Sequence, residues 1–488
     1  MLFNTWTFAV FLAGVFLLYY FTPVFRAHAV FQTGLLTVAS YLFYAWHTPW
    51  LVLVLAASTL INTWATWRLF SPTGSRDRDL WARRTVFFAV LGNLAVLAVF
   101  KYASLLVETF LPACWHKPWG FDLKTIPLPL GVSFFTFQGI SLVVDVYRKT
   151  KGQAELTWKS AELAGSEGRW RLLADVAFFK AFFPQLIAGP IVKAHQFMGQ
   201  IGAKAVSEIR WEEAGKKLIL GYFLKMVVAD NLREVTAGLA FPLFMDMPAI
   251  NLLFLLYAFS FQIFADFCGY SLIAMGLAAL FGYRLPLNFN FPYLSGSITE
   301  FWRRWHISLS TWLKEYLYIP LGGNRLGPMR TYLNLIVVML LGGLWHGAAW
   351  KFMFWGGAHG LFLAMERFFK NRGAGNKNPG FWVPWLRVAL TFHLVSALWL
   401  LFQLGNLREG WLFLGRMVHG PAGLSPQPVF SCLFFGAGVL LYHLWGWSRE
   451  HRPNLKKTFW LEGLAYALMA FLLLTNSGVS GAFIYFQF

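Results

Sequence analysis

Long apolar runs recur along the whole chain, and they constrain the fold more than any other feature of the sequence. Most are about as long as a helix that crosses a hydrocarbon core of roughly 30 Å. The chain is 57% hydrophobic and 13% charged, whereas about a quarter of the residues of a soluble domain are charged. The runs lie near residues 4–21, 29–46, 50–68, 85–107, 127–147, 174–191, 214–236, 248–280, 331–349, 352–369, 384–404, 428–447 and 459–475. The sequence therefore predicts an all-α, polytopic transmembrane protein with about eleven spans plus re-entrant segments.

No internal repeat divides the chain, so we expect residues 1–488 to form a single membrane-embedded domain. Too little chain lies between the apolar runs for a sizeable soluble core. The first run has no charged segment before it and no small-residue cleavage site after it. We therefore expect that run to be retained as a span.

An excess of basic residues gives a formal net charge of +19. Proteins that bind nucleic acid gather such charge into a patch or stripe, but here Lys and Arg are scattered between the apolar runs. This dispersal indicates cytoplasmic loops and anionic lipid headgroups, with no nucleic acid as partner. The three cysteines lie far apart without CxxC spacing, and they indicate neither a disulfide framework nor a zinc cluster.

The basic residues also predict the orientation in the membrane. Clusters of Lys and Arg follow the third and fifth runs and Arg26 follows the first, whereas the connection at 47–50 has no Lys or Arg. Cytoplasmic loops carry the excess of Lys and Arg, so the N-terminus is predicted to be extracytoplasmic. The basic connections 366–378 and 448–457 are cytoplasmic by the same rule. The run at 459–475 then brings the C-terminus to the outer face.

One run is interrupted. Residues 182–191 read "FFPQLIAGPI", and the two prolines and the glycine break a helix. Non-helical backbone at membrane depth persists only where it is buried in protein or lines a cavity. The stretch is thus a candidate re-entrant segment or chamber wall. An ordinary kink in a spanning helix remains the alternative.

Two histidines occur in unusual surroundings. His306 follows the basic and aromatic stretch "SITEFWRRW", and His346 ends an otherwise apolar run within "GGLWHGAAW". Imidazole is well matched to proton transfer near neutral pH. Gly342, Gly343 and Gly347 would let backbone or a ligand approach His346 closely. Both histidines are therefore candidate catalytic residues, although a buried histidine can also serve only as a structural hydrogen-bond donor.

Metal binding is the rival role for these histidines. His306, His346 and His359 form no HExxH pattern, and their separations in the chain match no standard ligand spacing. We predict no metal site.

Residues 299–325 interleave charged and aromatic side chains. Arg303, Arg304 and Arg325 could bind the phosphates of a nucleotide-bearing cofactor, since guanidinium groups match phosphate geometry. An aromatic segment anchored at the level of the headgroups explains the same composition.

Asp266, within "QIFADFCGYS", is an acidic residue inside a long apolar run. It could orient a catalytic histidine or hold a structural hydrogen bond. We favour the structural role.

The chain ends on "NSGVSGAFIYFQF", and in its last six residues only Gln487 is polar and only Tyr485 carries a reactive oxygen. We expect residues 476–488 to form an extracytoplasmic tail. An aromatic anchor at the membrane interface is one role for it.

Three stretches together resemble the membrane-bound O-acyltransferases: "FFPQLIAGPI", "NFNFPYLSGSITEFWRRWHISLSTWLKEYLYIPLGGNR" and "GGLWHGAAWKFMFWGGAHG". The resemblance extends from Ser40 to Glu366. It is strongest to the bacterial branch that acetylates alginate, cellulose or peptidoglycan, or D-alanylates teichoic acid. Ser271 is followed by Leu272, where alginate acetylases carry an aspartate, and this departure weakens the alginate assignment.

The resemblance implies a bowl-like helical fold with a thin centre and a central tunnel. It places the invariant histidine of the family on His346 and its second histidine on His306. The acyl donor that it implies is cytosolic acetyl-CoA, used as a substrate, with no bound cofactor.

The ending also resembles a known pattern. "FIYFQF" fits an F-x-Y-x-x-F motif like that of the small membrane protein that serves teichoic acid D-alanylation. By this likeness Tyr485 would accept the acetyl group and pass it to an extracytoplasmic SGNH-type acetyltransferase partner. Gly478, Ser480 and Gly481 would give the tail its reach.

The predicted function is that of an O-acetyltransferase in the bacterial cytoplasmic membrane. It would move acetyl from acetyl-CoA across the membrane to modify an envelope polysaccharide such as alginate, cellulose or peptidoglycan. The alternatives are a polytopic transporter or flippase that exports a lipid-linked or acylated substrate, and a scaffold that only recruits a secreted partner. The sequence leaves the polymer open.

Overall fold

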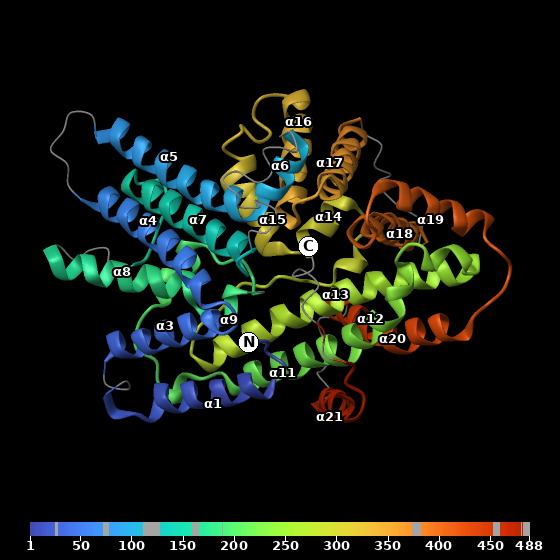
Figure 1. Ribbon diagram of the computed structural model, residues 1–488, viewed down its shortest axis with the longest axis horizontal. Helices are drawn as coiled ribbons and strands as arrows, with labels where there is room; N and C mark the ends of the chain where they lie inside the picture. Colours follow the sequence, from blue (N-terminus) through green and yellow to red (C-terminus); the bar gives the residue numbers. More distant parts are fainter. Residues whose placement is uncertain are drawn as a thin grey trace. The chain divides into compact units, whose positions relative to one another are not determined.

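The computed structural model describes residues 1–24, 28–71, 78–110, 127–158, 165–187, 189–372, 382–451, 459–479 and 481. Over these residues the chain is predominantly helical and contains no strand (Figure 1). The prediction of an all-α fold is confirmed. Two compact units can be distinguished: Met1–Gly215 with Ala274–Pro286, and Lys216–Ile273 with Leu287–Phe488.

The first unit is built from helices that follow one another along the N-terminal part of the chain. They are α1 (Trp6–Phe21), α3 (Ala29–Ala45), α4 (Val52–Phe70), α5 (Arg78–Leu97), α6 (Ala103–Phe110), α7 (Val132–Thr150), α8 (Gly165–Ala181), α9 (Phe183–Leu186) and α10 (Ala194–Phe197). Helices α11 (Trp211–Tyr222) and α13 (Ala249–Leu280) each contribute residues to both units.

A reciprocal amide pair lies in the core of the first unit. Asn62 of α4 and Asn93 of α5 each donate their side-chain N–H to the other's Oδ1 over 3.0 Å. Gly139 of α7 lies against this pair, and a Cβ there would come within 2.6 Å of Asn93 Oδ1. Buried amides in apolar surroundings need such partners, because an unmade hydrogen bond there is costly. The pair thus fixes how α4, α5 and α7 meet.

The predicted break in the run at 174–191 is confirmed. Helix α8 ends at Ala181, Phe182 adopts ψ 106°, and only the single turn of α9 follows. The break is buried within protein, and the Phe183 N–H donates to Ser40 Oγ over 3.0 Å. Protein groups therefore satisfy this irregular backbone, as backbone away from water requires. The assignment of this stretch to a cavity wall stays a prediction.

The second unit contains the C-terminal helices and several short ones. They are the π-helix η9 (Phe223–Ala229), α12 (Asp230–Thr236), α14 (Ile298–Arg304), α15 (Ile307–Leu313), α16 (Pro328–His346), α17 (Trp350–Asn371), α18 (Val383–Gln403), α19 (Leu407–His419), α20 (Pro426–His451) and α21 (Phe459–Thr475). Of these, α14, α15 and α19 were not predicted from hydrophobic runs, because each carries too many polar residues.

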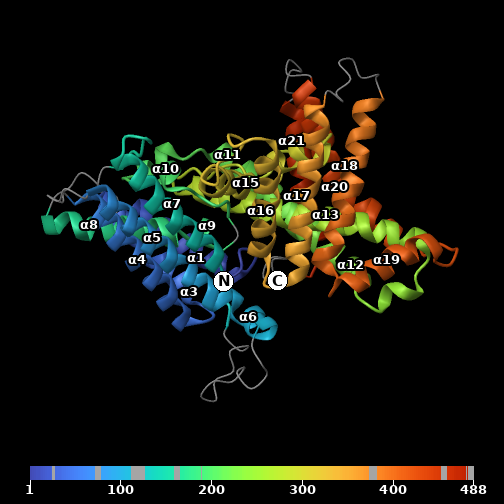
Figure 2. The same cartoon turned by 90° about the horizontal axis from the view of Figure 1, so that it is seen from above.

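Glycines let α16 and α17 pack backbone against backbone, side by side in both ribbon views (Figures 1 and 2). A Cβ on Gly343 would lie 3.1 Å from the Cα of Gly356, and one on Gly360 would lie 2.8 Å from the Cα of Ile336. Helices surrounded by lipid have no hydrophobic driving force to associate. Small residues at such spacing stabilise the pair because they allow close van der Waals contact. The close contact predicted for the glycines near His346 is made by α17 at Gly343 and Gly347, and by Leu313 at Gly342.

Six helices in the described part of the chain are long and apolar enough to cross a membrane. They are Pro49–Phe70, Arg78–Phe110, Ala249–Leu280, Pro328–His346, Val383–Gln403 and Pro426–His451, and α1, α3 and α21 are shorter apolar helices. The sequence predicted about eleven spans, and part of the difference lies in the runs at 174–191 and 214–236. These runs are divided into shorter helices rather than forming single long ones.

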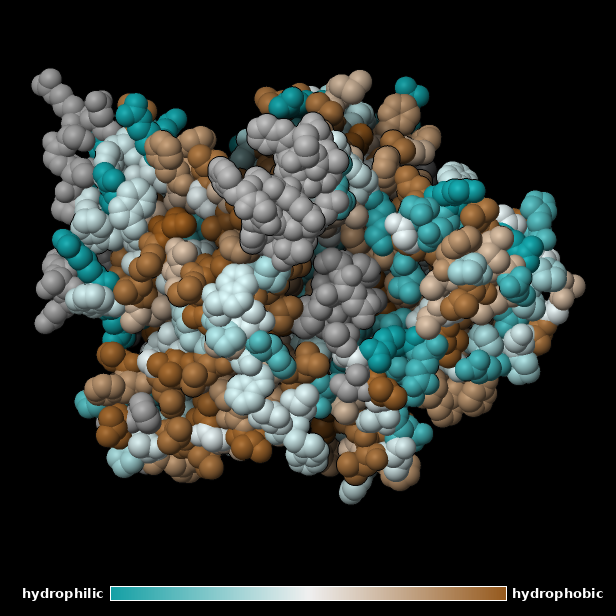
Figure 3. Space-filling model, in the orientation of Figure 1, coloured by the Kyte–Doolittle hydropathy of each residue, from teal (hydrophilic) through white to brown (hydrophobic). Residues whose placement is uncertain are grey.

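Apolar side chains cover the outer face of the first unit where Figure 1 places α1 and α3 (Figure 3). Val10, Leu17 and Phe21 of α1 and Val38 and Leu42 of α3 are all more than half exposed. A soluble surface rarely gathers so many large apolar groups in one place. Lipid is the environment that such a face fits.

The packing of α16 on α17 predicts a sharp difference between two adjacent glycines. Gly356→Ala places a methyl group against the backbone of Gly343, only 3.0 Å away, and overpacking of this kind costs about 1–3 kcal/mol. Gly357→Ala is the matched control, since its nearest neighbour is the end of the flexible Leu340 side chain. Thermal unfolding in detergent should show a lower midpoint for Gly356→Ala alone. Equal midpoints would contradict the close approach of the two helices.

Candidate active site

The structure brings the two predicted histidines together in the second unit. His306 lies at the junction between α14 and α15, and His346 is the last residue of α16. Their ring centroids are 6.1 Å apart, and both side chains are buried. Forty residues of sequence separate them, so only the fold makes them neighbours.

Aromatic rings surround both imidazoles. The ring of Phe267 lies 4.6 Å from that of His306, and Trp345 contacts both histidines at 5.7 and 5.0 Å. Trp355 stands perpendicular to His346 at 5.2 Å. Electrostatic interactions in such apolar surroundings are stronger than in water. A polar group bound between the histidines would therefore interact strongly with their ring dipoles.

His306 has a left-handed backbone conformation, with φ 43° and ψ 53°. This conformation is uncommon for a residue other than glycine, and it persists only where the surroundings hold it. Strain of this kind is frequent at functional sites. The conformation ends α14, starts α15 and fixes the place from which the imidazole projects.

Asn288 holds the strained junction. Its carbonyl oxygen accepts from the N–H of Ile307 over 2.9 Å, and its Oδ1 accepts from Ser308 Oγ over 2.8 Å. Its Nδ2 donates to Ser271 Oγ of α13 over 3.0 Å. The sequence analysis missed this residue. The available signal was an amide-bearing side chain just before an aromatic stretch, which is too common to single out.

Burial lowers the pKa of the His306 imidazole to about 3. His306 lies outside the six long apolar helices. Because the pKa of the His306 imidazole in the folded protein lies far below neutrality, the ring carries no charge at physiological pH. His306 can thus act through a neutral N–H or a ring lone pair, but not as a cation.

His359 lies one aromatic ring further from the pair. Its Nδ1 accepts from the indole N–H of Trp302 over 3.3 Å, so the tautomer carries its proton on Nε2. Trp355 lies between His359 and His346, and the ring centroids of Trp355 and His359 are 4.8 Å apart. The part of the chain that the structure describes holds no group of three or more His, Cys, Asp or Glu side chains arranged as metal ligands.

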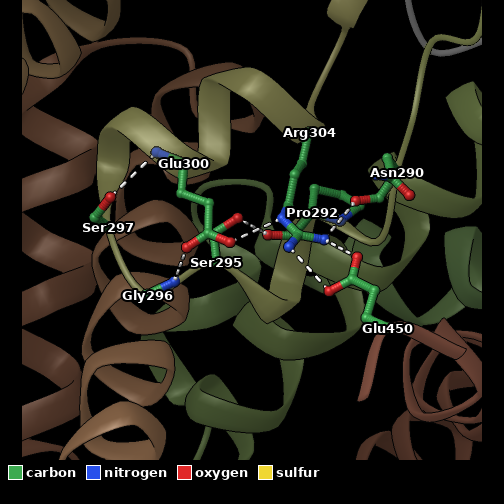
Figure 4. Close-up of polar contacts among 8 residues, drawn as sticks. All are labelled: Asn290, Pro292, Ser295, Gly296, Ser297, Glu300, Arg304 and Glu450. Carbon is green, nitrogen blue, oxygen red and sulfur yellow. Dashed lines mark hydrogen bonds and ion pairs between the residues drawn. The ribbon is translucent and has the colours of Figure 1, made fainter. Parts of the chain in front are cut away.

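The three arginines proposed for phosphate binding differ in their surroundings. Arg304 makes a bidentate contact to Glu450 at 2.6 and 3.1 Å, and its Nε donates to Glu300 over 2.9 Å (Figure 4). The hydrogen bond to Glu450 raises the pKa of Arg304. This guanidinium connects α14 to α20. Arg303 and Arg325 are exposed.

The second carboxylate of this network also supports the start of α14. Glu300 accepts from the N–H of Gly296 over 2.9 Å, and its own N–H donates to the side chain of Ser297, the N-cap of the helix (Figure 4). Arg304 and Glu300 together therefore fix both ends of the short helix that precedes His306.

Asp266 lies in an ion pair. Its Oδ1 is 2.7 Å from Lys225 Nζ, and Asp230 is equally close to the same ammonium group. All three side chains are buried. This arrangement agrees with the structural role favoured for Asp266. Tyr485, the third predicted catalytic residue, lies outside the described residues.

The sequence profile of the MBOAT family, the membrane-bound O-acyltransferases, matches residues 117–403. That range includes both histidines and the elements that hold them. The chain belongs to the membrane-bound O-acyltransferase family. It is a multi-pass membrane protein and, as a member of this family, an acyltransferase.

Several named relatives belong to the same group of bacterial proteins. The chain is 39% identical over 413 residues to "Probable alginate O-acetylase AlgI" of Pseudomonas aeruginosa, covering 82% of this chain and 73% of that protein. It is 34% identical over 488 residues to "Peptidoglycan O-acetyltransferase" of Helicobacter pylori, covering 96% of this chain and 87% of that protein. To "Teichoic acid D-alanyltransferase" of Bacillus subtilis it is 26% identical over 332 residues, covering 61% of this chain and 76% of that protein.

The junction at His306 predicts a stability cost for Asn288→Ala. The substitution leaves the buried Ser308 and Ser271 hydroxyls without their amide partner, and each such loss costs about 1–3 kcal/mol. Thermal unfolding should therefore occur at lower temperature. Asn290→Ala is the control, because Asn290 contacts Arg304 through its backbone, which the substitution retains. If both variants unfold at the wild-type temperature, Asn288 does not hold the junction.

Proposed function

We propose that the protein transfers acetyl from cytosolic acetyl-CoA to the outer face of a bacterial cytoplasmic membrane, where the acetyl group modifies an envelope polysaccharide. The observation that carries the proposal is the buried pair of His306 and His346, 6.1 Å apart at their ring centroids. The names of the relatives, alginate O-acetylase and peptidoglycan O-acetyltransferase, support the same reaction class.

In the proposed reaction a hydroxyl oxygen attacks the carbonyl carbon of the thioester. His346 accepts the hydroxyl proton as the new C–O bond forms. The neutral N–H of His306 stabilises the oxygen on which negative charge develops. The C–S bond then breaks, and the CoA sulfur takes the proton from His346. The products are the O-acetyl ester and CoA.

The acceptor hydroxyl in this proposal is that of Tyr485. The tail then presents the acetyl group outside, where an SGNH-type acetyltransferase takes it for a polysaccharide acceptor. This route needs the C-terminus to be extracytoplasmic, as the basic connections predict. It also explains how acetyl reaches a wall polymer while CoA remains in the cytoplasm.

Arg303 and Arg325 are the proposed contacts for the phosphates of acetyl-CoA. Both side chains are exposed, and Arg303 lies in the helix that ends just before His306. Arg304, proposed from sequence for the same role, has its guanidinium engaged by Glu300 and Glu450. We therefore give it the supporting role of holding α14 in place.

Labelled acetyl-CoA tests the reaction directly. Incubation of the purified protein should place a labelled acetyl group on the C-terminal peptide, detected by mass spectrometry. Tyr485→Phe should abolish this label because it removes the accepting oxygen. His346→Ala should slow labelling by about 10²-fold or more, the contribution expected of a general base.

The outcomes separate the rival functions. Label on the C-terminal peptide of Tyr485→Phe would contradict the carrier role. Wild-type labelling rates in a folded His346→Ala would remove its catalytic assignment. A transporter or flippase predicts movement of its substrate across vesicles with no covalent label and no release of CoA.

The arginines predict two different kinds of defect. Arg303→Ala and Arg325→Ala should each raise the KM for acetyl-CoA by about tenfold or more, since a charged hydrogen bond contributes about 1.5–3 kcal/mol. Their melting temperatures should equal that of the wild type. Arg304→Ala should lower the melting temperature, and Glu450→Gln should weaken the same contact. A rise in KM confined to Arg304→Ala would reverse these assignments.

A further inference from the structure

The last described residues of the chain lie on η9 and α12 of the second unit. The N–H of Gly478 donates to the carbonyl oxygen of Met226 over 2.9 Å. Asn231 Nδ2 donates to the carbonyl of Asn476 over 2.9 Å, and Arg233 Nη2 donates to the carbonyl of Val479 over 3.1 Å. The start of the tail is therefore bonded to one face of the protein through its backbone.

Gly478 is required by a close approach. A Cβ at this position would lie 2.8 Å from the carbonyl carbon of Asp230 and 2.8 Å from the nitrogen of Asn231. These are backbone atoms of a helix and cannot move aside. Gly481 lies against the guanidinium of Arg233, the end of a flexible side chain. Gly478 thus has a packing role in addition to the reach expected from the sequence.

The surface beneath the tail is built to be rigid. Lys225 of η9 is paired with Asp230 of α12 and with Asp266 of α13, and all three are buried. Asn231 also donates to the carbonyl of Val227 over 2.8 Å, which fixes the side chain that receives the tail. A second ion pair, Lys216 to Glu462 at 2.8 Å, joins α11 to the first turn of α21.

Little apolar burial holds the tail. The side chain of Val479 is 68% exposed, and residues 474–477 are exposed as well. Hydrogen bonds to Asn231, Arg233 and Met226 are therefore the main contacts of this segment. Contacts of this kind give a defined position but can break and reform easily.

We propose that Asn231 and Arg233 are positioning residues that dock residues 476–479, the root of the tail. The chain that leads to Tyr485 then starts from a fixed position before each transfer of acetyl to the tyrosine. This inference rests on the proposed function of Tyr485. Tyr485 follows Val479 by six residues, which extend at most about 20 Å. Without docking the free segment would begin at Thr475, and ten residues extend about 35 Å.

The docked root raises the effective concentration of the tyrosine. For a chain link this concentration falls roughly as the −3/2 power of its length, so growth from six to ten residues lowers it about twofold. Loss of the fixed direction adds to that factor, because orientation contributes separately to rate. The double substitution Asn231→Ala/Arg233→Ala should thus slow acetylation of the tail at least about twofold.

Hydrogen exchange tests docking without any acetyl transfer. The Gly478 amide, bonded to Met226 in the folded protein, should exchange slowly in the full-length protein and several-fold faster in the double variant. Gly478→Ala should accelerate exchange of the same peptide by forcing it off the helix. Glu234→Ala is the control, because Glu234 is an exposed neighbour on α12. Equal exchange in all four proteins would overturn the docking site.

Labelling with acetyl-CoA then tests positioning. Docking predicts that the double variant lowers the rate at which label appears on the C-terminal peptide, relative to the rate at which CoA is released by hydrolysis of acetyl-CoA. A general structural defect would lower both rates together and would overturn the positioning role. Faster exchange combined with absence of label on the wild-type tail would leave the docking site in place but refute the carrier role of Tyr485.

Discussion

The cost of burying polar groups in an apolar protein determines most of the structure described here. In each unit, polar side chains on different helices pair with one another and so offset this cost, because lipid and apolar rings cannot replace the hydrogen bonds of water. In the first unit Asn62 and Asn93 satisfy one another. In the second, Lys225 draws two carboxylates from different helices onto one ammonium group. Such pairs specify which helices meet, whereas apolar contacts alone would permit many arrangements.

The same constraint explains the geometry around His306. A left-handed residue between two short helices leaves backbone and hydroxyl groups that need partners, and Asn288 supplies several at once through its carbonyl, its Oδ1 and its Nδ2. The histidine can therefore adopt a conformation that sequence preference disfavours. On the opposite side, glycines bring α17 against α16, so that Trp355 packs on His346. Polar bonding fixes one imidazole and close helix packing fixes the other.

Sequence patterns were sufficient for the long helices, and they singled out the two histidines that the fold brings together. The apolar runs at 248–280 and 459–475 correspond almost residue for residue to α13 and α21, because length and hydropathy alone define such helices. The short helices α14 and α15 could not be predicted in this way. Their limits depend on Asn288 and Arg304, whose partners lie far along the chain. No local pattern encodes a partner that only the fold brings near.

Arg303 and Arg304, which lie within three residues of His306, show the same limit of prediction from local sequence. Composition treats Arg303 and Arg304 as equivalent, and both matched a phosphate-binding segment. The structure separates them, because successive residues of a helix point about 100° apart. Arg304 thereby meets Glu450, while Arg303 stays exposed. A charge count around a site is thus weaker evidence for ligand binding than the partners that each charge already has.

Helix α13 carries side chains that support the histidine pair and the ion pair beneath residues 476–479. Asp266 faces Lys225 beneath the docked tail, while its neighbour Phe267 packs on His306. Four residues after Phe267, Ser271 accepts the hydrogen bond of Asn288 that holds the His306 junction. Residues four apart lie on one face of a helix, so one face of α13 supports the histidines and the adjacent face supports the tail. A rotation of this helix would disturb both regions together, and the buried ion pair of Asp266 opposes it.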